Sequence, residues 1–200
     1  MTEVELKARV SDREKLIKTL DSFAKRKEEV IKEDRYFKNG QHLPPLRLRT
    51  ENYLKSSKTK RLLTYKHKKM LSGKDGTPTE VNEELESEVE NFSAIEQFLT
   101  DYGFTLSVKK RKEVLAWTFQ LKDDVLTSEC KEVLFELCKV HPLGDFLEIE
   151  VLVPNNDKAL TQKAQSLLLE LLARAGLSAS DLESKSYSQM LKETCYNPQF

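Results

Sequence analysis

The chain has 200 residues, of which 33% are charged and 38% hydrophobic, and 33 basic residues balance 33 acidic ones. This length suits one domain with a substantial core, so a single domain over residues 1–200 is expected. The zero net charge argues against a general nucleic-acid-binding protein. The chain has no apolar run of about 18 residues, which argues against a membrane span.

The first predicted element is a β-strand over residues 3–10, EVELKARV. Charged residues occupy every second position of this strand, at Glu3, Glu5, Lys7 and Arg9, and the positions between them are apolar. Successive side chains of a strand point to opposite faces, so one face is charged and the other apolar. A helix follows over residues 11–26, with Ser11 as its expected N-cap.

The middle of the chain predicts three more alternating strands, at residues 45–50, 62–70 and 83–89. Their charged faces carry Arg47 and Arg49, then Lys66 and Lys68, then Glu84, Glu86 and Glu88. Turn-forming residues predict loops at 39–45 and 72–79.

A second helix is expected between Ser93 and Gly103, because Ser93 and Glu96 have the spacing of a capping box. Four further strands are predicted at residues 107–114, 115–121, 134–140 and 146–153. Their charged faces carry Lys109, Arg111 and Glu113, then Glu136 beside Cys138, then Glu148 and Glu150; Lys110 and Lys112 interrupt the apolar side of the first of these strands, and 115–121 is more apolar. Helices at 157–176 and 187–192 complete the pattern.

The charged faces have two interpretations. A solvated face of an ordinary antiparallel sheet explains any one such strand. However, like charges recur two residues apart on strand after strand, which is unfavourable unless something of opposite charge lies between them. The helices also need an apolar surface to cover, and the other face of these strands offers one. We therefore expect an α+β fold, a closed antiparallel β-barrel with a charged lumen and helices packed outside.

Such a lumen would bind a strongly anionic ligand together with a metal ion. The bases that would converge on it are Lys7, Arg9, Arg47, Arg49, Lys66, Lys68, Lys109 and Arg111. Arginine and lysine both bind phosphate oxygens. The carboxylates would repel the ligand unless a hard divalent cation lay between them, and Mg²⁺ is commonly bound by carboxylates and phosphate oxygens together. Metal-assisted phosphoryl chemistry is the function this pattern predicts.

Eight segments, in order, resemble one known family. EVELKARV resembles the ExExK signature of the triphosphate tunnel metalloenzymes, the CYTH superfamily, which includes CyaB-like class IV adenylyl cyclases and thiamine triphosphatases. The other seven segments are DRYF, LRLR, LTYKHK, EELESEV, VKKR, LGDFLEIE and KSYSQML. The resemblance implies an eight-stranded antiparallel tunnel that holds a triphosphate with basic residues and Mg²⁺ or Mn²⁺ with glutamates.

The same resemblance implies roles for individual residues. It assigns metal binding to Glu3, Glu5 and Glu148, with Glu150 and Glu86 as candidates for a second ion. It assigns triphosphate binding to Lys7, Arg47, Arg49, Lys66, Lys68, Lys109 and Arg111, and catalysis to Lys7, Lys66 and Glu136. Cys138 stands where relatives often have Asp, and Asn82 where they often have Arg. Cys138 is interpreted as a buried structural thiol, and Tyr187 as a packed anchor.

Three functions remain open from the sequence. Cyclisation of ATP to cyclic AMP and pyrophosphate is favoured by the likeness of VELKARV, LGDFLEIE and SYSQML to class IV cyclases. Hydrolysis of tripolyphosphate, thiamine triphosphate or a nucleoside triphosphate is the alternative, and a non-catalytic polyphosphate-binding module is the third. The expected partner is a small-molecule triphosphate, with no nucleic acid and no membrane, and a homodimer is left open. Three cysteines without a CxxC pair indicate a reducing cytoplasm.

Overall fold

A computed structural model describes residues 1–40, 44–72, 78–122, 125–154 and 157–194. The strands of this part are β1 (Thr2–Val10), β2 (Lys25–Lys38), β3 (Leu46–Tyr53), β4 (Thr59–Ser72), β5 (Pro78–Glu88), β6 (Thr105–Gln120), β7 (Glu132–Val140) and β8 (Gly144–Val153). The helices are α1 (Arg13–Asp21), α2 (Ser93–Asp101), α3 (Lys158–Arg174), the 3₁₀-helix η1 (Ala179–Asp181) and α4 (Tyr187–Glu193). None of the helices described is long and apolar enough to cross a membrane.

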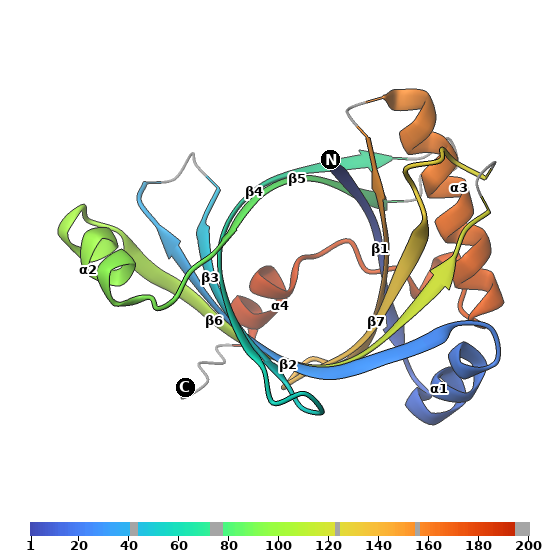
Figure 1. Ribbon diagram of the computed structural model, residues 1–200, viewed down its shortest axis with the longest axis horizontal. Coiled ribbons are helices and arrows are strands. Elements are labelled where there is room, and N and C mark those ends of the chain that lie inside the picture. Colours follow the sequence, from blue (N-terminus) through green and yellow to red (C-terminus); the bar gives the residue numbers. More distant parts are fainter. Residues whose placement is uncertain (41–43, 73–77, 123–124, 155–156, 195–200) are drawn as a thin grey trace.

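The eight described strands form one closed antiparallel barrel, seen as a ring in Figure 1. Their order around the barrel is β1-β5-β4-β3-β2-β6-β7-β8. Closure joins the first strand to the last, with Thr2 opposite Val153 and Glu5 opposite Glu150. The α+β class and the closed barrel predicted from the sequence are confirmed.

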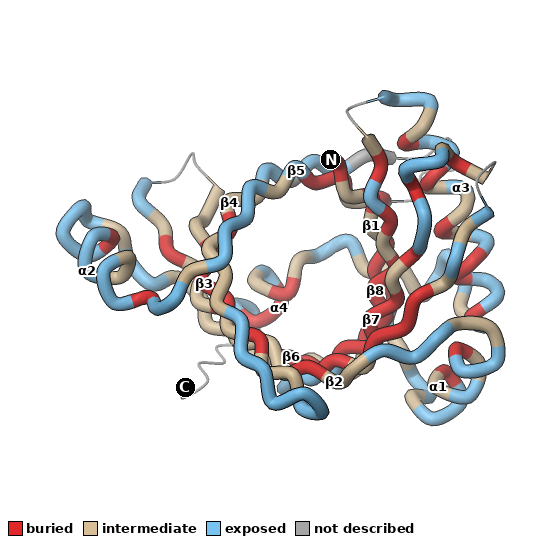
Figure 2. Tube along the Cα trace, viewed as in Figure 1, coloured by how far each residue is buried: buried red, intermediate tan, exposed pale blue. Residues whose placement is uncertain are grey.

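The main hydrophobic core lies outside the barrel wall, between strands and helices. Val4, Leu6 and Ala8 of β1 are buried and pack in one cluster with Leu20 of α1 and Leu168 of α3. The buried segments in Figure 2 accordingly follow β1, β7 and β8, where α1 and α3 cover the wall. The alternation of the first strand thus sorts its residues as expected, because the apolar side faces the helices.

The remaining helices cover other parts of the barrel. On α2, Leu99 packs with Phe92, Phe37 and Leu48 in a smaller cluster against β2 and β3. α4 lies across one end of the barrel, where Figure 1 shows it behind the ring of strands. Tyr187 of α4 packs against residues whose side chains face the lumen, among them Cys138 and Phe146.

Several predicted boundaries are wrong. The segments 107–114 and 115–121 form one strand, β6, and the eighth strand is β2, of which the sequence indicated only Asp34–Phe37. The predicted helix 11–26 ends at Asp21, because β2 starts at Lys25, and its N-cap is Asp12, whose side chain accepts a hydrogen bond from the Lys15 N–H.

The second helix also begins differently from the prediction. Phe92 is the N-cap of α2 and makes no side-chain cap, so Ser93 lies inside the first turn. Glu96 is engaged instead in an ion pair with Arg35 of β2. The predicted loop at 39–45 falls partly outside the described residues, at 41–43, and that at 72–79 does so at 73–77.

Candidate functional site

The barrel encloses a cavity of about 920 Å³. Its lining is dominated by charged side chains from every strand of the barrel, together with residues of α4 such as Tyr187 and Gln189. On β1 the lining residues are Glu3, Glu5 and Lys7, which alternate with the apolar residues of the outer core. The charged faces of the strands therefore converge on one enclosed space, as the sequence predicted.

Three carboxylates meet on one side of this cavity. Single carboxylate oxygens of Glu3, Glu5 and Glu150 all lie within 4.8 Å of one another. We call these three residues the crowded group. Burial, followed by the charges of Glu80 and Glu148, holds the pKa of Glu5 well above its usual value. Burial and the charge of Glu3 do the same for Glu150.

The crowded group has the chemistry of a site for a hard divalent cation. Carboxylate oxygens are the ligands that Mg²⁺ and Mn²⁺ prefer, and a cation among them would relieve the repulsion that raises their pKa values. The donor set therefore fits the ion that the resemblance implies. Glu150, expected only as a ligand of a second ion, lies in the same group as Glu3 and Glu5.

Lys66 of β4 reaches the crowded group from across the neighbouring strand. Its Nζ lies 3.0 Å from Glu3 and 2.7 Å from Glu84. Burial opposes its charge, but Glu3 and Glu5 outweigh this and hold the pKa of Lys66 well above its usual value. Glu3 also accepts a hydrogen bond of 2.7 Å from Asn82, the residue that replaces the expected arginine.

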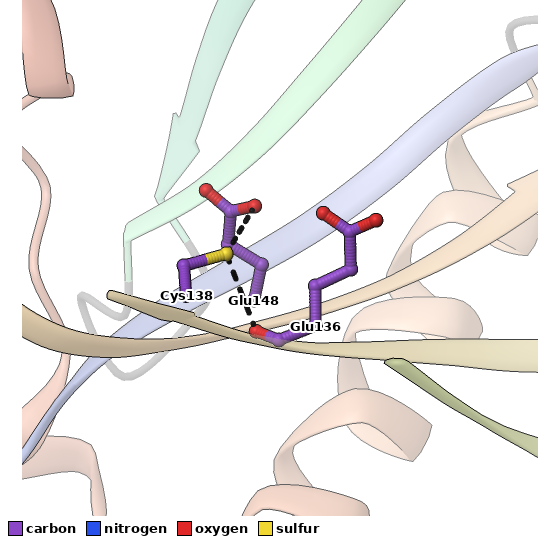
Figure 3. Close-up of side chains that lie close together, drawn as sticks. All are labelled: Glu136, Cys138 and Glu148. Carbon is purple, nitrogen blue, oxygen red and sulfur yellow. Dashed lines mark hydrogen bonds between the residues drawn. The ribbon is translucent and has the colours of Figure 1, made fainter. Parts of the chain in front are cut away.

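A second cluster contains Glu136, Cys138 and Glu148, which Figure 3 shows side by side. The Cys138 thiol donates to a Glu148 carboxylate oxygen at 3.4 Å and lies 3.6 Å from the Glu136 carbonyl oxygen. Burial and the charge of Glu148 raise the pKa of Cys138 well above its usual value. A thiol held protonated in this way fits the structural role expected for Cys138.

The carboxylates of this cluster already have cationic partners. Lys112 lies 2.5 Å from Glu148 and 3.4 Å from Glu136, and Lys32 lies 2.5 Å from Glu136. Burial alone would raise the pKa of Glu136, but Lys32 and Lys112 lower it to about 2. Lys112 in the same way lowers the pKa of Glu148 against the effect of burial. Glu148, expected as a metal ligand, is therefore neutralised by a lysine.

Asp34 forms the third charge-paired position, on β2. It is fully buried and accepts hydrogen bonds from Arg49 Nε at 2.6 Å and Arg49 Nη2 at 3.0 Å, while Lys110 Nζ lies 2.8 Å away. Burial would raise its pKa, but Arg49 and Lys110 hold it well below the usual value. We call Asp34, Glu136 and Glu148 the paired group, because basic partners lower the pKa of each one against the effect of burial.

Other predicted residues lie in the cavity wall. Arg47 is buried, with its Nη2 3.1 Å from Thr64 Oγ1 and 3.4 Å from Glu84. Lys7 lies towards α4, where its Nζ donates to the carbonyl oxygen of Lys185 at 2.6 Å and sits 4.8 Å from the centre of the Tyr187 ring. Tyr187 is buried, as expected of a packed anchor.

The expected lumen face of β6 is wrong. Lys110 and Lys112 line the cavity, and Lys109 and Arg111 lie on the opposite face of the strand, opposite Arg35 and Glu33 of β2. Arg111 is 40% exposed and pairs with Glu113 at 2.8 Å. Consecutive charges from 109 to 113 hid the parity of this strand, because both of its faces are charged here.

The roles predicted for Glu86 and Lys68 stay predictions. Glu86 lines the cavity, but it accepts from Thr64 Oγ1 at 2.9 Å and does not belong to the crowded group. Lys68 pairs with Asn82 in the strand register, and its side chain lies outside the described part of the structure.

Sequence reasoning missed several residues of the wall. Those with direct contacts to the predicted site are Lys32, Glu80, Lys110 and Lys112 of the cavity lining, and Asp34 behind it. Glu84 was predicted on a charged strand face and Asn82 was noted as a replacement, but neither was given a role in the site. Lys32 could not be predicted as a residue of the cavity wall, because no strand was predicted around it. Asp34 could have been found, since it opens the DRYF segment and has the same strand parity as Tyr36.

Comparisons with known proteins agree with this geometry. The sequence profile of the CYTH domain matches residues 1–187. Among curated protein sequences, none matches the chain.

Three solved structures with a similar fold come from three different organisms. The PH1819 protein of Pyrococcus horikoshii OT3 has a TM-score of 0.74 at 22% identity, over 96% of this chain and 99% of its own. A candidate adenylate cyclase of Vibrio parahaemolyticus has a TM-score of 0.69 at 16% identity, over 96% and 98%. The Hippeastrum protein HpAC1, a candidate adenylyl cyclase described as having a dominant triphosphatase activity, has a TM-score of 0.60 at 15% identity, over 96% of both chains. At these identities the likeness shows a shared fold.

Proposed function

This chain belongs to the CYTH domain family, and on that premise we propose that it is a divalent-metal-dependent enzyme that hydrolyses a triphosphate held inside its barrel. The observation that carries the proposal is the crowded group, Glu3, Glu5 and Glu150, in a cavity otherwise rich in arginine and lysine. These carboxylates would repel an anionic ligand unless a divalent cation lay between them, so simple anion binding gains nothing from them.

Metal binding falls to Glu3, Glu5 and Glu150 in this proposal. Mg²⁺ or Mn²⁺ held there would stabilise charge on the phosphate oxygens and help to orient the attacking oxygen. Glu148 is not a metal ligand in this proposal, because it forms a salt bridge of 2.5 Å with Lys112.

The substrate is bound by six of the basic residues that line the cavity: Lys7, Arg47, Arg49, Lys66, Lys110 and Lys112. Two of them are pre-oriented by Asp34, which fixes the Arg49 guanidinium through two hydrogen bonds and holds the Lys110 ammonium. Side chains held in place before the substrate arrives lose less freedom when they contact phosphate oxygens. Lys109 and Arg111 have no part in this set, because they lie on the outer face.

Glu136 is better suited to positioning than to proton transfer. Efficient general bases have a pKa near the working pH. Lys32 and Lys112 hold the pKa of Glu136 at about 2, which leaves its carboxylate a weak base at neutral pH. Its contacts with Lys32 at 2.5 Å and with Lys112 at 3.4 Å instead fix the places of those ammonium groups.

The choice of hydrolysis rests on the described lining of the cavity. Its aromatic side chains within that lining are Tyr36 and Tyr187. The Lys110 ammonium lies 5.5 Å from the Tyr36 ring centre and 5.2 Å from that of Tyr187, so neither ring presents an open platform to adenine. Cyclisation of ATP is the second candidate, favoured by the likeness of VELKARV, LGDFLEIE and SYSQML to class IV cyclases. The activity described for HpAC1 is consistent with either reaction on this fold.

One assay separates the candidates. The purified protein is incubated with tripolyphosphate, thiamine triphosphate or ATP, each with Mg²⁺, with Mn²⁺ and with a chelator, and the products are analysed. Orthophosphate released only with metal supports hydrolysis, whereas cyclic AMP with pyrophosphate supports cyclisation. Tight binding of all three compounds without any product would leave the chain as a polyphosphate-binding module and refute the enzyme proposal. A reducing cytoplasm is the compartment we propose for it.

A further inference from the structure

The Lys66 ammonium is surrounded by carboxylates from two other strands. Its Nζ lies 2.7 Å from Glu84, 3.0 Å from Glu3, 3.6 Å from Glu80 and 3.9 Å from Glu5. Two of these four, Glu3 and Glu5, belong to the crowded group that fits a divalent cation. The side chain of Lys66 therefore contacts the same carboxylates that a metal ion would use.

The contact with Lys66 occupies one of the two carboxylate oxygens that Glu3 could offer to a metal ion. Oε1 of Glu3 accepts from Lys66 Nζ at 3.0 Å and from Asn82 Nδ2 at 2.7 Å. A carboxylate oxygen directed at two N–H donors must give up at least one of them to coordinate an ion. In addition, an ammonium and a divalent cation within a few ångströms repel each other strongly in a partly dehydrated site, where screening is weak.

The Lys66 side chain can move away from Glu3 and Glu5. Its side chain is 24% exposed to the cavity and carries its charge on a flexible four-carbon stem. The Asp34-bound Arg49 offers a contrast, because its guanidinium is fixed by two hydrogen bonds. A phosphate oxygen in the cavity would offer the Lys66 ammonium a new anionic partner.

We propose that Lys66 is a tethered counter-ion of Glu3 and Glu5, which it releases when a divalent metal binds so that its ammonium turns to the triphosphate. This inference rests on the proposed metal site and goes beyond it, because it predicts that metal and triphosphate bind cooperatively. An anion that draws Lys66 away from Glu3 and Glu5 makes the metal site available. By linkage, the metal then strengthens anion binding by the same factor.

The test measures metal binding without any substrate. Mn²⁺ is titrated calorimetrically into anion-free wild-type protein, Lys66→Gln and Lys32→Gln. Lys66→Gln removes the competing ammonium and is expected to tighten the Mn²⁺ Kd by at least about fivefold. Lys32→Gln is the matched control, since Lys32 contacts Glu136 and Glu51 and acts on Glu150 only through space. Its Kd is expected to change clearly less than that of Lys66→Gln.

The outcomes are distinct. An unchanged or weaker Kd in Lys66→Gln overturns the inference but leaves the metal site intact, and so does equal tightening in both variants, because a general charge effect then suffices. Absence of Mn²⁺ binding in the wild type and in Lys66→Gln overturns both the inference and the proposed metal dependence. Binding that appears only in Lys66→Gln supports the inference in its strongest form.

A second measurement covers a failure of Lys66→Gln to fold. The ammonium resonance of Lys66 is followed by NMR in ¹⁵N-labelled wild-type protein, and Lys66→Arg, which keeps the positive charge, assigns it. Addition of Mg²⁺ is expected to shift this resonance, because the ammonium loses its contacts with Glu3 and Glu5. A resonance that stays in place while Mg²⁺ binds would contradict the inference.

Discussion

Two groups of carboxylates line the same cavity in opposite electrostatic states. In the paired group, Asp34, Glu136 and Glu148, basic partners outweigh burial and lower the pKa of each residue. In the crowded group, burial and neighbouring carboxylates raise the pKa of Glu5 and Glu150. The lumen therefore contains two kinds of carboxylate. Basic residues of the chain balance the charge of the first kind, and an external cation would stabilise the second.

Under the proposed function, this difference separates structural from functional acids better than burial does. The two groups together contain six acids of the barrel interior. Binding of a divalent ion to the paired group would break salt bridges of 2.5 to 2.8 Å. In the crowded group it would displace the longer contact of 3.0 Å between Glu3 and Lys66. Removal of a paired acid should therefore cost stability, and removal of a crowded acid should cost activity. The predictions below test that division.

The largest effect is expected from Asp34→Asn. The change leaves Arg49 and Lys110 buried without their carboxylate, and loss of one partner of a buried ion pair typically costs about 3–5 kcal/mol. The free energy of unfolding, measured with urea, should fall by that amount. Glu33→Gln, on the neighbouring outer-facing position of β2, is the control and should change it by less than about 0.5 kcal/mol. Equal losses in both variants would contradict the division.

Glu5→Gln should have the next largest effect, on turnover. Loss of a metal ligand should reduce kcat by at least about 100-fold, since even outer partners of metal ligands commonly cost about 10–100-fold. Because the pKa of Glu5 is raised in the fold, the neutral side chain should leave the free energy of unfolding unchanged or higher. Both quantities are measured on the same preparation.

The control for Glu5→Gln is Glu86→Gln, which alters a cavity carboxylate outside the crowded group. Its kcat should stay much closer to the wild-type value. A Glu5→Gln protein that turned over at the wild-type rate would show that the crowded group does not bind the catalytic metal.

Acid should weaken the wild-type protein more than Asp34→Asn. An unfolded aspartate takes up its proton near pH 3.9, whereas the folded Asp34 does so at a lower pH. Below about pH 4 the unfolded chain therefore binds more protons, and the stability that Asp34 contributes is lost as the pH falls. The amide of the variant cannot titrate, so its unfolding free energy should decline less between pH 5 and about pH 3. Parallel declines in urea unfolding curves would contradict this assignment.

The smallest effect is expected outside the barrel. Arg111→Gln alters an exposed pair with Glu113 and should change kcat by no more than about twofold and stability by less than about 0.5 kcal/mol. Lys112→Gln, one position along the same strand, leaves Glu148 without its 2.5 Å partner and should lower both. Similar losses in the two variants would show that the outer face also serves the site.

The sequence predicted the barrel because its clearest strands carry charge on one face only. In β1 the alternation from Glu3 to Arg9 is unbroken, and the structure follows it. In β6 charges fill both faces between Lys109 and Glu113, since the outer ones pair with Glu33 and with each other. No local pattern could decide which of those charges faces inward.

The division between paired and crowded acids could not be predicted from the sequence, for a different reason. It depends on contacts across the barrel, such as that of Lys32 with Glu136, which are 104 positions apart. Glu148 and Glu150 lie on the same strand face with the same local pattern, yet only Glu148 meets a lysine at 2.5 Å. Their difference arises from closure of the sheet, which brings Lys112 to one and Glu3 to the other.

Closure between the first and last strands also bears on how the protein reaches its active form. Glu5 and Glu150 face each other across the β1–β8 pairing, so the proposed metal site exists only after the first and last strands of the chain have paired. Pairings between remote segments make folding slow, because loop-closure entropy is lost before contacts repay it. During synthesis, this site would be among the last features to form, and a divalent ion that bound there would stabilise the closed barrel.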